Sequence, residues 1–155
     1  LASSSDVPLI TPTMIDELIA RCQPLDADYY YTYATKEKME KRFPDSKRTY
    51  VKLKGVEISG GDLGLLRAST IDSNQELFEA LSQARKHAWK IAKVVGLKML
   101  IKYLFRRLGL PELKVEAERI LGGPVRIVEV PFAELAMDAD KVAQVDMLRA
   151  EFSKP

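Results

Sequence analysis

The sequence has 155 residues, with 24 Lys and Arg against 22 Asp and Glu, so the net charge at pH 7 is only +2. Hydrophobic residues make up 46% and charged residues 30%, which is typical of a globular domain with a buried core and excludes a disordered tail. The single cysteine, Cys22, excludes an internal disulfide and a cysteine zinc cluster. No apolar run approaches the roughly 20 residues of a membrane-spanning helix. We therefore expect one cytoplasmic domain.

The first part of the chain predicts a strand, a helix and a second strand. Residues 3–10, SSSDVPLI, are typical of the carboxyl end of a buried strand. Thr11 and Pro12 form an N-cap and a first helical position, and apolar residues then recur at helical spacing to about Cys22. The aromatic stretch 29–33 favours a strand.

The next segments predict a short charged helix over residues 35–43, which Pro44 stops, and then two strands. The second strand, within VEISGGDLGLLRA, contains the pair Gly60 and Gly61. Adjacent glycines in a strand pattern indicate a bulge or a close backbone approach, although a plain hairpin turn fits the local pattern equally well.

The pattern turns helical from about residue 72 to about residue 121, with Gly96 as a break. A short apolar strand, VRIVEV, a loop and a last helix over residues 140–152 follow. Strands that alternate with helices predict an α/β domain in which helices cover a sheet, with residues 72–121 as a helical insertion.

The helical insertion is strongly basic, because no acidic residue lies between Glu79 and Glu112. Its basic residues are Arg85, Lys86, Lys90, Lys93, Lys98, Lys102, Arg106 and Arg107. Lys98, Lys102 and Arg106 have a spacing of four and form one stripe on a helix, opposite an apolar face. Three interpretations remain open: a solvated face over the core, a phosphate site, or a surface that binds a membrane or nucleic acid.

Few residues offer catalytic chemistry. The single histidine, His87, cannot supply a zinc triad, and serine-nucleophile, Walker and dinucleotide-binding motifs are absent. Asp6 at a strand end, and Asp138 with Asp140 after the last strand, could together hold one Mg²⁺. Asp140 is equally consistent with an N-cap of the last helix.

Three segments resemble a known family. SSSDVPLITPTMIDELI, FPDSKRTYVKLKGVEISGGDL and ELAMDADKVAQVDML occur in the order found in nucleotidyltransferases similar to molybdenum-cofactor guanylyltransferase. That family has the fold of the nucleotide-sugar-dependent glycosyltransferases of the A type. The resemblance implies a mixed, mainly parallel sheet covered by helices. It also implies transfer of a nucleotidyl group from an NTP to a phosphorylated or sugar-like acceptor, with release of pyrophosphate.

The resemblance also implies roles for individual residues. Asp6 and Asp140 would be catalytic ligands of Mg²⁺, and Asp138 an accessory metal carboxylate. The residues implied to contact the substrates are Lys47, Arg48, Thr49, Lys52, Gly60, Gly61 and Asp62. For the basic residues among them, a solvated charged edge is an equal alternative.

The sequence departs from the family in three places, one of which is KVAQV where the family has K-P-E-D-L. Its nucleotide-gripping N-terminal loop, LAGG-x-S-x-R-MG, has no counterpart here, so we expect residues 1–155 to be the C-terminal part of one domain, incomplete at its N-terminal half and inactive alone. The missing half would then be a partner, beside the NTP and the acceptor. Asp62 stands where Asn is usual. The competing hypothesis is a non-enzymatic module whose basic helices bind an anionic membrane surface or nucleic acid.

Overall fold

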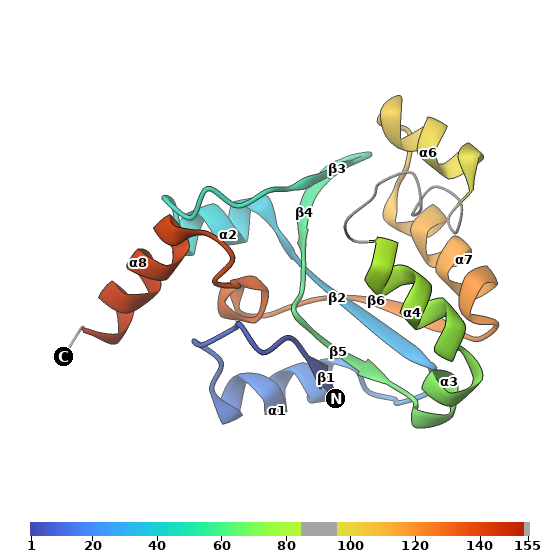
Figure 1. Ribbon diagram of the computed structural model, residues 1–155, viewed down its shortest axis with the longest axis horizontal. Coiled ribbons are helices and arrows are strands. Elements are labelled where there is room, and N and C mark those ends of the chain that lie inside the picture. The colour runs from blue at the N-terminus through green and yellow to red at the C-terminus, as the bar shows by residue number, and fades with distance from the viewer. Residues whose placement is uncertain (85–95, 154–155) are drawn as a thin grey trace.

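The structure, a computed structural model, describes residues 1–84 and 96–153, with residues 80–84 described by their backbone alone (Figure 1). Five residues of the predicted basic segment, Arg85, Lys86, His87, Lys90 and Lys93, lie outside the described residues. Within the described residues, no helix is both long enough and apolar enough to cross a membrane.

The described strands and helices follow the predicted order. The strands are β1 (Ala2–Ser3), β2 (Tyr29–Thr35), β3 (Val51–Leu53), β4 (Val56–Gly60), β5 (Leu63–Leu66) and β6 (Val125–Glu129). The helices are α1 (Pro12–Arg21), α2 (Lys36–Arg42), α3 (Ala68–Ser73), α4 (Gln75–Ala84), α6 (Leu97–Leu104), α7 (Leu110–Leu121) and α8 (Val142–Phe152), with a 3-10 helix η1 (Ala133–Ala136) after β6.

The described strands form a six-stranded sheet with β2 at its centre (Figure 1). β2 pairs in parallel with β6 on one side, and on the other side it pairs antiparallel with β4 and β5 in succession. β1 pairs antiparallel with β5, and β3 antiparallel with β4. The strands β1, β2, β3 and β6 therefore share one direction, and β4 and β5 run against them.

The expectation of a mainly parallel sheet is wrong. Of the pairings among the described strands, that between β2 and β6 is parallel and the others are antiparallel. The cause is the connection between β3 and β4, a tight turn in which Gly55 has a φ of +82°. A tight turn reverses the chain, whereas a parallel pairing requires a longer crossover. The reversed strand β5 then lies between β1 and β2, and the reversed strand β4 lies between β2 and β3.

The start of α1 is as predicted. Thr11 is the N-cap, its hydroxyl accepts a hydrogen bond from the Met14 amide, and Pro12 occupies the first turn. The helix predicted before Pro44 is also confirmed as α2. Thr35 is its N-cap, and the Thr35 hydroxyl accepts a hydrogen bond from the Lys38 amide. The starts of both helices are therefore determined by N-cap residues that the sequence shows, Thr11 and Thr35.

The main core lies against one face of β2. Tyr30, Thr32 and Ala34 alternate along the strand and are buried, together with Leu18 of α1 and Met39 of α2. The period of two places these three side chains on one face of the sheet. A second, smaller cluster joins Leu53 and Ile58 of β3 and β4 to Met99 of α6 and Leu108, and it attaches the helical insertion to the far end of the sheet.

The basic stripe predicted on the helical insertion is shorter than expected. Lys98 and Lys102 lie on α6, but α6 ends at Leu104, and Arg106 has a positive φ of 52° beyond the helix. Arg106 is therefore not on the same helical face as the two lysines.

The pair Gly60 and Gly61 interrupts the strand between β4 and β5, so the predicted bulge or close approach is confirmed. The Gly61 amide donates to the Thr32 carbonyl at 2.8 Å. A Cβ at Gly61 would lie 2.9 Å from the Thr32 Cβ and 3.0 Å from its backbone carbon, and closer still to its hydroxyl. Glycine is required here by the approach of β2.

We expect Gly61→Ala to lower the free energy of unfolding by about 2 kcal/mol, the usual size of an overpacking penalty. Urea denaturation followed by circular dichroism measures this loss. If the Thr32 hydroxyl is the obstacle, the loss should shrink by about 1 kcal/mol when Gly61→Ala is made in a Thr32→Ala background. Equal losses in the two backgrounds would contradict this explanation.

Candidate functional site

Three segments that are distant in the sequence meet at one rim of the sheet. The Ser4 amide, next to β1, donates to the Asp62 carbonyl at 2.8 Å, and the Asp62 amide donates to the Leu135 carbonyl at 3.0 Å. The Ala139 amide donates to the Asp6 carbonyl at 3.0 Å. Backbone hydrogen bonds therefore hold the segment after β1, the bulge between β4 and β5, and the segment after η1 side by side.

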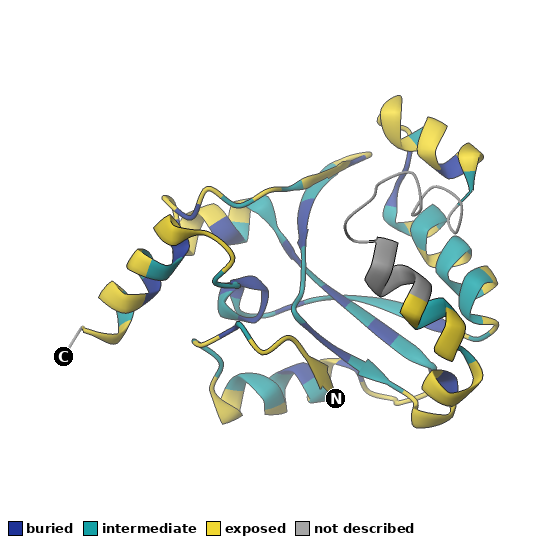
Figure 2. Cartoon of the chain, in the orientation of Figure 1, coloured by how far each residue is buried: buried dark blue, intermediate teal, exposed yellow. Residues whose placement is uncertain are grey.

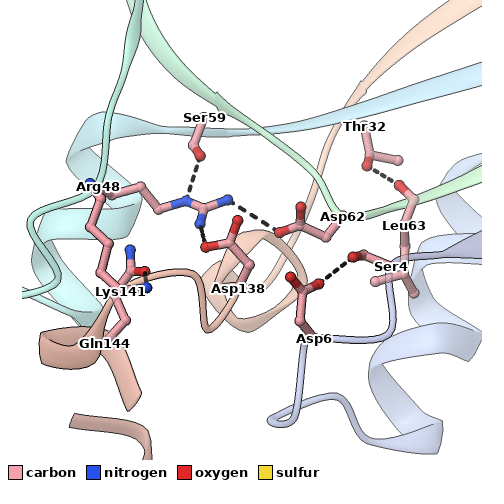
Figure 3. A network of polar contacts seen from close by, with 10 residues as sticks. All are labelled: Ser4, Asp6, Thr32, Arg48, Ser59, Asp62, Leu63, Asp138, Lys141 and Gln144. Atoms are coloured by element: carbon pink, nitrogen blue, oxygen red, sulfur yellow. Dashed lines mark hydrogen bonds and ion pairs between the residues drawn. The ribbon is translucent and has the colours of Figure 1, made fainter. Parts of the chain in front are cut away.

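A buried arginine lies among the carboxylates that these segments carry (Figure 3). The Arg48 Nη2 atom is 3.2 Å from Asp62 Oδ2, and its Nη1 atom donates to Asp138 Oδ1. Its Nε atom donates to the Ser59 hydroxyl at 2.7 Å. The Arg48 side chain is only 8% exposed. Because charges with so little solvent are costly unless paired, this arginine and its two aspartates depend on one another.

Local structure between α2 and β3 directs Arg48 inward. Phe43 and Ser46 are buried, and Lys47, just before Arg48, has a positive φ of 48°. The Lys141 Nζ atom donates to the Lys47 carbonyl at 2.9 Å. The start of α8 thus holds the arginine-bearing segment from outside.

The acidic groups outnumber the positive charge at this rim. Burial raises the pKa of Asp62 from its ordinary value of 3.8 to about 6, Arg48 opposes the rise, and the carboxylates of Asp138, Asp6 and Asp140 add to it. In the described part of the chain, Asp6 forms no ion pair and accepts a hydrogen bond from the neutral Ser4 hydroxyl. The rim therefore has a negative potential that favours a proton or a cation.

The structure places the segment that carries Asp6 beside the segment that carries Asp138 and Asp140. Asp138 and Asp140 flank Ala139, whose amide donates a hydrogen bond to the Asp6 carbonyl. Figure 3 shows the side chains of Asp6, Asp62 and Asp138 near one another. Asp140 is exposed, and it is not the N-cap of α8, because that position is Lys141. The alternative role of Asp140 as an N-cap is therefore wrong.

Among the described residues, no three His, Cys, Asp or Glu side chains form a group ready to hold a metal ion. The metal-binding role of Asp6, Asp138 and Asp140 stays a prediction. Asp62, predicted to contact substrate, belongs to the same acidic cluster through Arg48.

The other residues predicted to contact substrate have different settings. Arg48 is engaged by carboxylates, whereas Thr49 is exposed beside it. Lys52 lies on β3, opposite Glu57 in the register and 3.9 Å from its carboxylate, outside the acidic cluster. Gly60 has the Tyr31 hydroxyl 3.0 Å from where a Cβ would stand.

Three residues of the site were missed by the sequence analysis. Ser59 holds the Arg48 guanidinium, Ser4 contacts Asp6, and Lys141 holds the Lys47 carbonyl. The strand pattern of VEISGG offers a signal for Ser59, because a serine at a buried strand position requires a polar partner. The contact of Ser4 with Asp6 is local, because the two residues are separated by one position, and the run SSSD offers a signal for it. The contact of Lys141 with Lys47 joins residues far apart in the sequence and follows from the tertiary fold.

A solved structure described as a hypothetical transferase from Thermus thermophilus is similar to this chain, with a TM-score of 0.80 and 32% sequence identity. The similarity covers 90% of this chain and 59% of that chain, so this chain spans about three fifths of the other's length. No protein-family model matches the sequence, and no curated protein matches it. The chain thus shares its fold with part of a protein described as a hypothetical transferase.

We expect Asp62→Asn to stabilise the protein at pH 7 by about 2 kcal/mol, because it removes a carboxylate whose pKa is raised to about 6 even with Arg48 beside it, while Arg48 keeps its pairing with Asp138. The folded state binds more protons than the unfolded state between pH 3.8 and about 6. Wild-type stability should therefore fall as the pH rises through this window, and the advantage of the variant should vanish below about pH 4.

Urea denaturation of both proteins at several pH values from about 4 to 7 measures this difference. The control is Asp146→Asn, which replaces an exposed carboxylate on α8 and should track the wild type. A difference between Asp62→Asn and the wild type that does not change with pH would contradict the electrostatic account.

Proposed function

We propose that this chain is the metal and acceptor side of a nucleotidyltransferase that moves a nucleotidyl group from an NTP to a phosphorylated or sugar-like acceptor. The observation that carries the proposal is the hydrogen bond between the Ala139 amide and the Asp6 carbonyl, which holds the segment of Asp6 beside the segment of Asp138 and Asp140. The resemblance of these segments to the guanylyltransferase-like family, and the similarity to a hypothetical transferase, support the same class.

The residues present fit a Mg²⁺ ion. Arg48 compensates the charges of Asp62 and Asp138, whereas Asp6 and Asp140 form no ion pair in the described part of the chain. Mg²⁺ is commonly held by one or two carboxylates, with water and substrate phosphates completing its shell, so a group of three protein ligands is not required. The raised pKa of Asp62 supports a local excess of negative charge. Asp6 and Asp140 are the proposed ligands.

Bound Mg²⁺ would neutralise charge on the phosphate oxygens and so lower the barrier to attack at the α-phosphorus. The chain's own residues would position that ion. Arg48 binds both Asp62 and Asp138. Its positive charge would offset the repulsion between these two carboxylates and so keep the segments that carry them together. Ser59 fixes the plane of the guanidinium.

Arg48 has a different role from the one the sequence suggested. A guanidinium already paired with two carboxylates has few donors left for a phosphate. The exposed Lys47 and Thr49, on either side of it, are better placed to meet an acceptor from solvent. We therefore assign acceptor contacts to Lys47 and Thr49, and positioning of the carboxylates to Arg48.

We expect pyrophosphate release from an NTP and a phosphorylated acceptor by the longer protein to which this chain would belong, and none by the 155-residue chain alone. Asp6→Asn in the longer protein should reduce the rate by at least about 100-fold, since electrostatic stabilisation by a metal contributes several kcal/mol. Asp146→Asn, on the exposed side of α8, should leave the rate unchanged.

Direct binding of Mn²⁺, an oxygen-ligand probe for the Mg²⁺ position, separates metal binding from catalysis. In the 155-residue chain, Mn²⁺ should broaden the amide signals of Asp6 and Ala139 before those of α8, and Asp6→Asn should weaken this effect by at least about tenfold. Equal broadening along α8, or no response to Asp6→Asn, would sink the proposal, as would pyrophosphate release by the isolated chain.

A further inference from the structure

The helix α6 turns an apolar face away from the body of the protein. Leu97, Leu100, Ile101 and Leu104 follow a spacing of three and four, which places them on one side of the helix with Phe105 next to them. Leu97 is 69% exposed, Leu104 67% and Phe105 72%. The opposite side carries Met99, which is buried in the smaller core cluster. Figure 2 shows α6 projecting from the molecule, exposed along most of its length.

Positively charged residues lie on one side of α6 and just after its end. Lys98, Arg106 and Arg107 are exposed and form no ion pair in the described part of the chain, and Lys102 is 3.8 Å from Glu112. The sequence has no acidic residue between Glu79 and Glu112. An exposed patch that combines aliphatic and aromatic side chains with unpaired cations is unusual on a soluble surface and marks an interaction site.

We propose that this patch, Leu97, Leu100, Ile101, Leu104 and Phe105 with Lys98, Arg106 and Arg107, binds the surface of an anionic lipid membrane. The apolar side chains would enter the boundary between headgroups and acyl chains, while the cations would meet anionic headgroups. Because α6 has eight residues and a length of about 12 Å, it would lie on the membrane rather than cross it.

Other partners suit the patch less well. Nucleic acid binds cations through its phosphates and stacks its bases on aromatic rings, but four exposed aliphatic side chains would make few favourable contacts with it. A symmetric dimer would place Lys98, Arg106 and Arg107 of one copy near the same residues of the other, with repulsion between like charges. Only an anionic lipid surface matches both the apolar and the positive parts. The membrane association would hold whether or not the acidic cluster binds Mg²⁺.

Co-sedimentation of the 155-residue chain with vesicles tests this proposal. The chain should sediment with phosphatidylcholine vesicles that contain about 30% phosphatidylglycerol, and not with phosphatidylcholine alone, and added salt should weaken the binding. Leu104→Ala with Phe105→Ala should weaken it by at least about tenfold. The matched control is Val142→Ala with Phe152→Ala, which removes side chains 78% and 64% exposed on α8 and should have no effect.

Circular dichroism melting checks that each variant folds. If the apolar variant does not, Lys98→Glu with Arg107→Glu, which changes exposed charges only, should abolish binding to the anionic vesicles. Several results would overturn the proposal: no binding to anionic vesicles, equal loss in the α8 control, tighter binding to a single-stranded oligonucleotide, or a dimer that the α6 variant dissociates and that does not bind vesicles.

Discussion

The pairing of Arg48 with Asp62 and Asp138 is the interaction on which the rest of this rim depends. Four aspartates lie close enough to influence one another, and only one buried cation opposes them among the described residues. Without that cation the carboxylates would repel each other and favour solvent, so the segments that carry them would separate. The arginine comes from a fourth segment, between α2 and β3, and ties it to the other three.

The reversed strand pair β4 and β5 explains why the carboxylates converge. Both strands pair with β2, and β5 also pairs with β1. The bulge between them therefore lies beside the segment after β1 and the segment after β6, to which Asp62 is hydrogen-bonded. A bulge redirects the side chain beside it, and here that side chain is Asp62. Gly61 permits the bulge, because the absence of a side chain lets β2 approach closely. The same bulge that requires glycine therefore also positions Asp62 in the charge cluster.

Local signals in the sequence predicted local structure well. The cap at Thr11, the stop before Pro44 and the interruption at Gly60 each depend on chemistry within a few residues, and each is confirmed. The relative direction of two strands depends on which strands pair in the folded protein. The order of strands and helices along the sequence does not specify these pairings, so the prediction of a mainly parallel sheet was wrong. For the site, the sequence shows the aspartates as residue types. The inward direction of Arg48 depends on the folded segment between α2 and β3 and on the contact of Lys141 with the Lys47 carbonyl. The role of Arg48 could not be predicted from spacing.

The central claim, that Arg48 and the carboxylates form one interdependent cluster, is tested most directly by a double-mutant cycle. Urea denaturation of Arg48→Met, Asp138→Asn and the double variant gives the coupling free energy between the two side chains. We predict a coupling of at least about 1.5 kcal/mol, several times the roughly 0.3 kcal/mol expected for the exposed pair Arg149 and Asp146. A coupling no larger than that of the exposed pair would contradict the account.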